Sequence, residues 1–72
     1  DYEQAFKIFD DLASKGDAKA QYGLGFMYET GKAVKMDKKE AIKWYKKSSK
    51  QGYKKAQKAL DDVCSENPFI CR

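Results

Sequence analysis

Histidine and long hydrophobic runs are both absent from this sequence of 72 residues. Without histidine the chain lacks the commonest general base and the commonest metal ligand, so we expect no catalytic residue, no metal site and no cofactor. No apolar run approaches the ~18 residues that a membrane-spanning helix needs. The chain is nevertheless expected to fold, because 14% of its residues are aromatic and disordered chains lack aromatics. These properties predict one small basic domain that binds a partner and is not an enzyme.

Cysteine is also scarce, occurring only as Cys64 and Cys71 near the end of the sequence. The Asn67-Pro68 pair between them predicts a turn that can bring the two sulfur atoms together. A zinc site would need four ligands, and no histidine or further cysteine is there to supply them. We therefore predict a local disulfide, with two free thiols as the alternative. The disulfide indicates a periplasmic or secreted protein, because disulfides persist in oxidising compartments, whereas free thiols would fit a cytoplasmic one.

The sequence contains an internal repeat at an offset of 36 residues, and a period in the mid-thirties is typical of helix–turn–helix solenoids. Both copies share a Gly-x-x-Lys-Ala-Gln segment, which begins at Gly16 and again at Gly52. The residues that recur are Asp1, Ala5, Lys7, Gly16, Lys19, Ala20, Gln21 and Leu24, as Asp37, Ala41, Lys43, Gly52, Lys55, Ala56, Gln57 and Leu60.

Apolar residues at steps of three and four predict four helices. The first ends before Gly16, which can adopt the left-handed backbone conformation, and Asp17 can cap the second helix, over about residues 18–30. The third is expected over about residues 37–50, with Asp37 and Glu40 as a capping box, and the fourth over about residues 54–64. Two glycines inside the second helix are expected to let neighbouring helices approach closely. The expected inner faces hold Tyr2, Ala5, Phe6, Phe9, Leu12 and Ala13, then Ala20, Leu24, Met27 and Tyr28, then Ala41, Trp44, Tyr45 and Ser48, and finally Ala56, Ala59, Leu60 and Val63.

A joint pattern runs through the repeat, consisting of Ala20-Gln21-Tyr22-Gly23-Leu24-Gly25-Phe26-Met27-Tyr28, then Gly31, Val34, Asp37, Ala41 and Trp44-Tyr45, and finally Gln51-Gly52 and Ala56-Gln57. This pattern resembles the Sel-one-like repeat, a relative of the tetratricopeptide repeat. The resemblance implies an all-α, antiparallel helix-hairpin α-solenoid over residues 1–63. That region would hold the second helix of one repeat, one complete repeat and the first helix of a terminal repeat, followed by a tail at 64–72. The family pattern usually has a glycine where Ala33 stands, so the loop there is expected to bend differently.

The resemblance also implies a protein–protein interaction module with a groove lined by the first helix of each repeat. Within that groove, Tyr22 and Phe26 lie one turn apart and are expected to anchor the partner, because aromatics dominate binding hot spots. The alternative is that both rings pack against the neighbouring helix. A missing repeat or a second copy of the chain could occupy the groove instead of another protein. The expected groove residues are Lys19, Tyr22, Phe26, Glu29, Lys55, Lys58 and Asp62.

Positive charge is concentrated in residues 32–58, which contain eleven lysines and two acidic residues and so have a net charge of +9. The rest of the sequence has a net charge of −5. The lysines of the third helix are expected to share an outer face opposite Trp44 and Tyr45. This face is either simply solvated or a docking patch for an acidic protein or an anionic membrane, which gives an alternative function. Nucleic acid is disfavoured, because the patch has no arginine to contact base edges and no aromatic row to stack on bases. The expected basic face consists of Lys39, Lys43, Lys46, Lys47 and Lys50.

Overall fold

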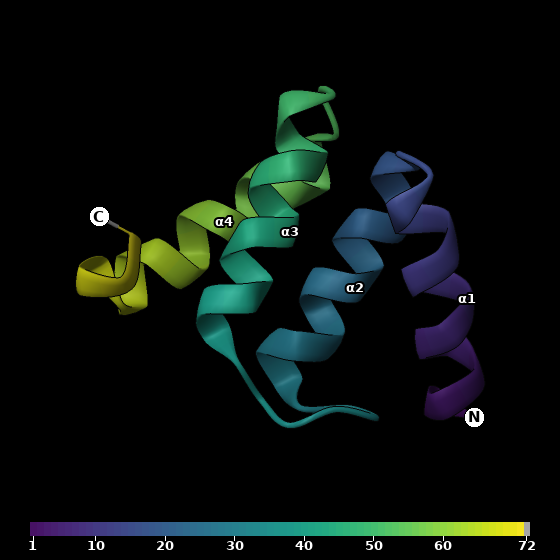
Figure 1. Cartoon of the computed structure of the whole chain (residues 1–72). Helices are drawn as coiled ribbons and strands as arrows, with labels where there is room; N and C mark the ends of the chain where they lie inside the picture. The colour runs from purple at the N-terminus through teal and green to yellow at the C-terminus, as the bar shows by residue number, and fades with distance from the viewer. Residues whose placement is uncertain (72) are drawn as a thin grey trace.

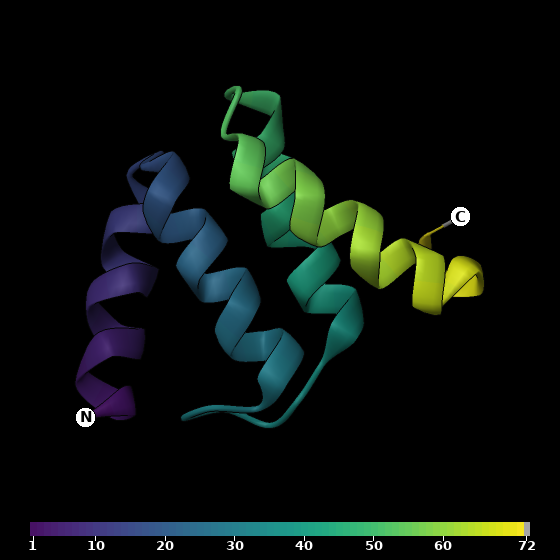
Figure 2. The same cartoon turned by 180° about the vertical axis from the view of Figure 1, so that it is seen from behind.

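The computed structural model describes residues 1–71, which form four α-helices and a short 3-10 helix without any β-strand. The elements are α1 (Tyr2–Ser14), α2 (Ala18–Thr30), α3 (Lys38–Lys50), α4 (Lys54–Glu66) and η1 (Pro68–Cys71). In Figure 1, α1, α2 and α3 lie next to one another in chain order, and in Figure 2, seen from behind, α4 crosses in front of α3. The all-α helix-hairpin solenoid predicted from the sequence is therefore confirmed.

Aspartates cap the N-termini of α1, α2 and α3, whereas Tyr53 precedes α4 without a capping hydrogen bond from its side chain. The side chain of Asp17 accepts a hydrogen bond of 2.9 Å from the backbone N–H of Ala20, and that of Asp37 accepts one of 3.1 Å from Glu40. The second half of the expected capping box is missing, because the Glu40 carboxylate instead accepts a hydrogen bond from Trp44 Nε1 at 3.2 Å. A capping side chain satisfies a backbone N–H that the helix itself cannot, so these two residues set where α2 and α3 begin.

Helices α1, α2 and α3 each end shortly before a glycine with positive φ, namely Gly16, Gly31 and Gly52. Gly16 and Gly31 have φ values of +98° and +72°, the left-handed conformation that ends a helix at little cost. Ala33, which stands where the family pattern has glycine, also has a positive φ of 66°. Ala33 therefore adopts here the left-handed conformation that a glycine would adopt more easily. The helix α4 continues to Glu66, two residues beyond its expected end, so Cys64 lies within a helix and not in a tail.

The helix α2 packs between α1 and α3, and Gly25 makes its contact with α3 possible. A Cβ atom at Gly25 would lie 2.7 Å from two ring atoms of Tyr45, so only glycine allows α3 to approach so closely. Tyr45 and Leu24 are fully buried, as expected. Tyr2, expected on an inner face, is 58% exposed, because on this side of α1 no further helix of residues 1–71 packs.

Two buried polar side chains tie the helix hairpins together. Gln21 donates a hydrogen bond from Nε2 to the backbone carbonyl of Ala13 at 3.2 Å and accepts one from Gln51 Nε2 at 2.9 Å. The Ser48 hydroxyl donates to the carbonyl oxygen of Ala18 at 2.7 Å. Because unsatisfied buried polar groups are costly, these bonds fix the ends of α1, α2 and α3 relative to one another.

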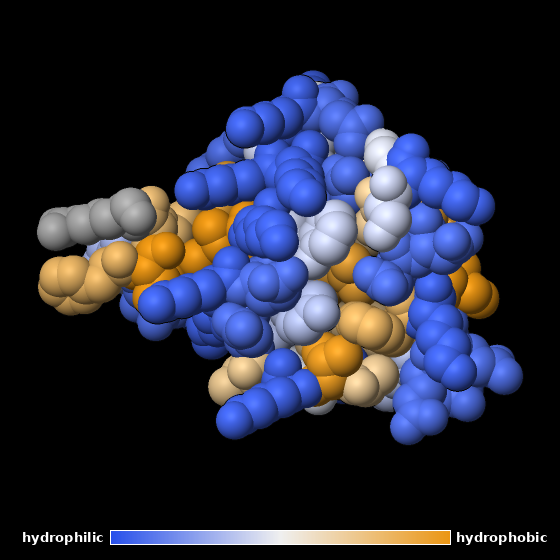
Figure 3. Space-filling view, viewed as in Figure 1, coloured by the Kyte–Doolittle hydropathy of each residue, from blue (hydrophilic) through white to orange (hydrophobic). Residues whose placement is uncertain are grey.

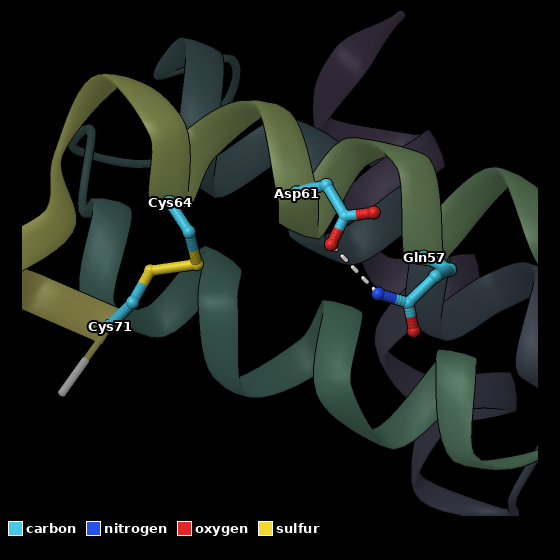
Figure 4. The surroundings of a disulfide bond; sticks show 4 residues. All are labelled: Gln57, Asp61, Cys64 and Cys71. Carbon is cyan, nitrogen blue, oxygen red and sulfur yellow. Dashed lines mark hydrogen bonds between the residues drawn. A yellow bond between two sulfur atoms is a disulfide. The ribbon is translucent and has the colours of Figure 1, made fainter.

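The disulfide predicted between Cys64 and Cys71 is present and joins α4 to η1, with 5.6 Å between the two Cα atoms (Figure 4). Asp61, about one turn before Cys64 on α4, accepts a hydrogen bond of 2.9 Å from the side chain of Gln57. Ile70 and Cys71 pack against the buried cluster around Ile42 and Val63. The crosslink therefore holds η1 against the part of the core that α3 and α4 form.

Candidate functional site

An elongated hollow of about 540 Å³ lies between α1 and α2, with the start of α4 at its edge. Its walls are mostly apolar, and lysines stand among the lining residues. We call this hollow the groove. Its lining residues are Tyr2, Ala5, Phe9 and Leu12 from α1; Asp17, Lys19, Ala20, Tyr22, Gly23, Phe26 and Met27 from the start of α2 onward; and Lys32, Tyr53 and Lys55 from later in the chain.

The structure brings together four of the seven expected groove residues, namely Lys19, Tyr22, Phe26 and Lys55. The other three do not line the groove. The carboxylate of Glu29 accepts a hydrogen bond of 2.6 Å from the Tyr45 hydroxyl, which directs it toward α3. Lys58 and Asp62 are exposed on α4 outside the groove. The expected row along α2 and α4 is therefore interrupted, because α4 diverges from α2 after its first turn.

The two aromatic residues expected to anchor a partner have different surroundings. The Tyr22 ring is half-buried, with its centroid 5.8 Å from that of Tyr45 and 5.5 Å from that of Tyr53. Phe26, one turn further along α2, is 45% exposed. Tyr22 thus packs against neighbouring helices, as the alternative interpretation held, while Phe26 offers its ring to solvent at the groove.

Two tyrosines that pack in the interior, Tyr28 and Tyr45, keep their phenol groups neutral. Burial, followed by the hydrogen bond to Glu29 and the charge of that carboxylate, raises the pKa of Tyr45 far above its ordinary value. Burial also raises the pKa of Tyr28, with smaller contributions from nearby carboxylates such as Glu40. Neither phenol therefore ionises near neutral pH.

The α1 wall of the groove was not recognised from the sequence, although the repeat contains the signal. With an offset of 36, Tyr2, Ala5, Phe9 and Leu12 of α1 correspond to Lys38, Ala41, Tyr45 and Ser48 of α3. Three of those α3 residues contact α2, because Ala41 and Tyr45 lie against Gly25 and Ser48 donates a hydrogen bond to Ala18. The side of α1 that borders the groove therefore corresponds to the side of α3 on which α2 packs. Its position and its mostly apolar lining suit the packing of a helix.

A second hollow, of about 580 Å³, lies between α3 and η1, and all five lysines of the expected basic face line it. We call it the basic hollow. Two of these lysines differ from expectation, because Lys43 and Lys47 do not lie opposite Trp44. Their Nζ atoms lie 5.9 Å and 4.6 Å from the centroid of its ring, a cation–π arrangement. The remaining residues that line the basic hollow are apolar, namely Ile42, Phe69 and Ile70.

Within residues 1–71 no group of three or more cysteine, aspartate or glutamate side chains is arranged to hold a metal ion. None of the helices in that part of the chain has the length and hydrophobicity to cross a bilayer. The features that remain are two surfaces suited to binding, the groove and the basic hollow.

Comparison with known proteins agrees with this architecture. The Sel1 repeat family model matches residues 18–53, which is half of the chain. Among solved structures, the crystal structure of a Sel1 repeat protein from Oxalobacter formigenes superposes with a TM-score of 0.84 at 36% sequence identity. The match covers 89% of this chain and 26% of that one, so this chain corresponds to about a quarter of the length of that protein. No curated protein matches the chain.

Sel1 repeats form a non-catalytic type of module that generally mediates interactions between proteins. The fold, the period of 36 residues, the glycine contacts of α2 and the matched region all agree with one another. The chain belongs to the Sel1 repeat family.

Proposed function

We propose that this chain is a protein-binding module that docks its partner in the groove between α1 and α2. The observation that carries this proposal is the exposure of Phe26, which is 45% exposed and lines a mostly apolar hollow. A large aromatic side chain exposed at a preformed hollow is the usual anchor of a protein interface. The role of Sel1 repeats as interaction modules supports the same conclusion.

Two further features of the groove support a role for the residues around Phe26. Tyr22 is held by Tyr45 and Tyr53, so its exposed edge is pre-positioned and little side-chain entropy is lost when a partner binds. Lys19 and Lys55 supply positive charge beside the apolar surface. A partner segment with an apolar centre and acidic flanks would complement this arrangement. Glu29, Lys58 and Asp62 are left out of the contact surface, because they do not line the groove.

Site-specific photo-crosslinking tests the proposal. A benzophenone amino acid placed at position 26 is expected to capture a protein partner in cells of the source organism. The same amino acid at position 8 is the matched control, because Ile8 is a 57% exposed hydrophobic residue of α1 that does not line the groove. Equal adducts at both positions, or none at position 26, would contradict the proposal.

Binding measurements with the captured partner sharpen this test. Phe26→Ala is expected to weaken binding by about thirtyfold, the effect of removing a hot-spot aromatic, whereas Ile8→Ala leaves it unchanged. Binding through the groove is expected to persist at ~0.5 M salt, because apolar contacts are not screened. Binding that disappears at that salt concentration would instead indicate the lysine surface.

We also propose that the protein functions in an oxidising compartment, the periplasm or the exterior of the cell. The disulfide between Cys64 and Cys71 supports this location, since such bonds are rare in the cytoplasm. Mass spectrometry of the native protein after alkylation under non-reducing conditions tests it. An unmodified disulfide is expected, and two alkylated thiols would favour the cytoplasm.

A further inference from the structure

The basic hollow combines a concentration of positive charge on one helix with apolar residues. Five lysines of α3 surround it, and three apolar residues, Ile42, Phe69 and Ile70, complete its lining. Figure 3 shows hydrophobic surface at the C-terminal end of the molecule, next to the hydrophilic surface of α3. No residue is shared between the basic hollow and the groove, so the two surfaces can act independently.

The apolar part of this surface is fixed in place. Phe69 is 79% exposed, although it belongs to η1, whose last residue is covalently attached to α4 through the disulfide. The preceding turn is closed by a hydrogen bond of 3.2 Å from the N–H of Ile70 to the carbonyl of Asn67. Ile70 packs against the buried cluster of α3 and α4. The Phe69 ring is therefore held beside the lysines of α3 and is not carried on a mobile chain end.

The charged part of the surface suits a diffuse anionic partner. No acidic residue lines the basic hollow, and Glu40, the only acid within α3, is engaged by Trp44 and lies 3.8 Å from Lys43 Nζ. All five cations are lysines, which act as point charges, whereas paired recognition of single carboxylates or phosphates favours arginine. An exposed aromatic ring flanked by lysines is the combination by which peripheral proteins bind anionic bilayers.

We propose that the basic hollow binds the surface of an anionic phospholipid bilayer, with the lysines at the headgroups and Phe69 inserted between them. Phosphate groups of the lipids would lie against Lys43, Lys46 and Lys50, while the ring enters the boundary with the acyl chains. The disulfide makes this arrangement redox-dependent, because reduction frees η1 and leaves only the lysines in place. This proposal does not rest on binding in the groove.

Co-sedimentation with vesicles tests the proposal. The vesicles consist of phosphatidylcholine with roughly one phosphatidylglycerol in four lipids, and pure phosphatidylcholine vesicles serve as the uncharged control. Each lysine near an anionic surface contributes about a fivefold increase in partitioning, so the triple variant Lys43→Gln, Lys46→Gln, Lys50→Gln is expected to bind ~100-fold more weakly. The matched control is Lys7→Gln, Lys35→Gln, Lys54→Gln, which loses the same charge outside the basic hollow and is expected to lose less than about tenfold.

Two measurements distinguish insertion from simple adsorption of lysines. Phe69→Ala is expected to reduce partitioning by about tenfold, because the variant lacks the ring whose transfer from water into the bilayer favours binding. Its exposure means that this substitution leaves the fold intact, which circular dichroism verifies. In the Phe69→Trp variant, lipids with brominated acyl chains are expected to quench the added fluorescence, and reduction of the disulfide is expected to weaken both quenching and partitioning.

Several results would overturn the proposal. Equal losses in the two triple variants would mean that net charge alone drives adsorption. Unchanged partitioning of Phe69→Ala, or the absence of quenching in Phe69→Trp, would mean that no insertion occurs. Binding to polyglutamate or to single-stranded RNA that is as tight as binding to the anionic vesicles would identify an anionic polymer as the partner.

Discussion

Replacement of Gly25 by alanine tests the contact that brings α2 and α3 together. A Cβ atom at this position would lie 2.7 Å from Cδ1 and Cε1 of Tyr45 and 3.2 Å from the carbonyl oxygen of Ala41. The Tyr45 ring is fully buried, and its hydroxyl is held by Glu29 at 2.6 Å, so the ring cannot swing away. The added methyl group therefore forces the two helices apart.

The magnitude follows from two opposing effects. Overpacking in a core costs about 1–3 kcal/mol, and the upper end applies here because both the ring and the opposing backbone are fixed. Alanine is favoured over glycine inside a helix by about 1 kcal/mol, which offsets part of that cost. The expected net loss is about 2 kcal/mol in the free energy of unfolding. In a domain of this size about 4–8 °C of Tm is lost per kcal/mol, so Tm is expected to fall by about 8–16 °C.

Gly23→Ala is the matched control for thermal unfolding followed by far-ultraviolet circular dichroism. Its Cβ atom would lie 2.9 Å from Cε2 of Phe9, but that ring is only half-buried and borders the open groove. The ring can move into the groove, and the gain in helix propensity offsets the remaining strain, so Tm is expected to stay within about 4 °C of the wild type. A Gly25→Ala variant as stable as the wild type, or an equal loss in Gly23→Ala, would refute this account of the packing.

The remaining predictions concern the disulfide and the buried phenol. Removal of the crosslink by Cys64→Ser with Cys71→Ser is expected to cost about 2.5 kcal/mol from loop entropy, measured by urea unfolding, and equal stability of the reduced and oxidised protein would contradict this. The raised pKa of Tyr45 predicts a stability that is complete below the ordinary tyrosine pKa of about 10 and falls above it, because the unfolded state then releases a proton that the folded state retains. Tyr45→Phe is expected to lower the free energy of unfolding by about 1–2 kcal/mol at neutral pH, because the hydrogen bond to Glu29 is lost. The variant is also expected to lose less stability above pH ~10 than the wild type, and an unchanged dependence on pH would contradict the assignment.

Local signals in the sequence predicted the helices well because they act through neighbouring residues. Asp17 and Asp37 cap the helices that follow them, and Gly16 and Gly31 adopt the left-handed conformation, as expected. The conformation of Ala33 departs from these local preferences. The loop geometry is imposed by the helices on either side, so alanine is held in a conformation that glycine would adopt more easily.

The groove was predicted less completely than the helices. The sequence identified Phe26, Tyr22 and two lysines, but it assigned the whole apolar stripe of α1 to the core. That stripe has two sides. Phe6 and Ala13 pack against α2, whereas Tyr2 and Leu12 border the groove, and periodicity alone does not distinguish a side that is covered from one that is open.

By itself, the sequence determined the helix boundaries to within two residues and the 36-residue repeat, because propensity, capping and periodicity are local properties of the chain. The family followed from the resemblance of its residue pattern to the Sel-one-like repeat. The tertiary structure alone decided which surfaces are available for binding. The divergence of α4 from α2 separates Lys58 and Asp62 from the groove, and the crosslink to Cys64 holds Phe69 beside the lysines of α3. Both outcomes depend on helix packing angles and on a contact between separate elements, which are set by the shapes of buried side chains across the whole core.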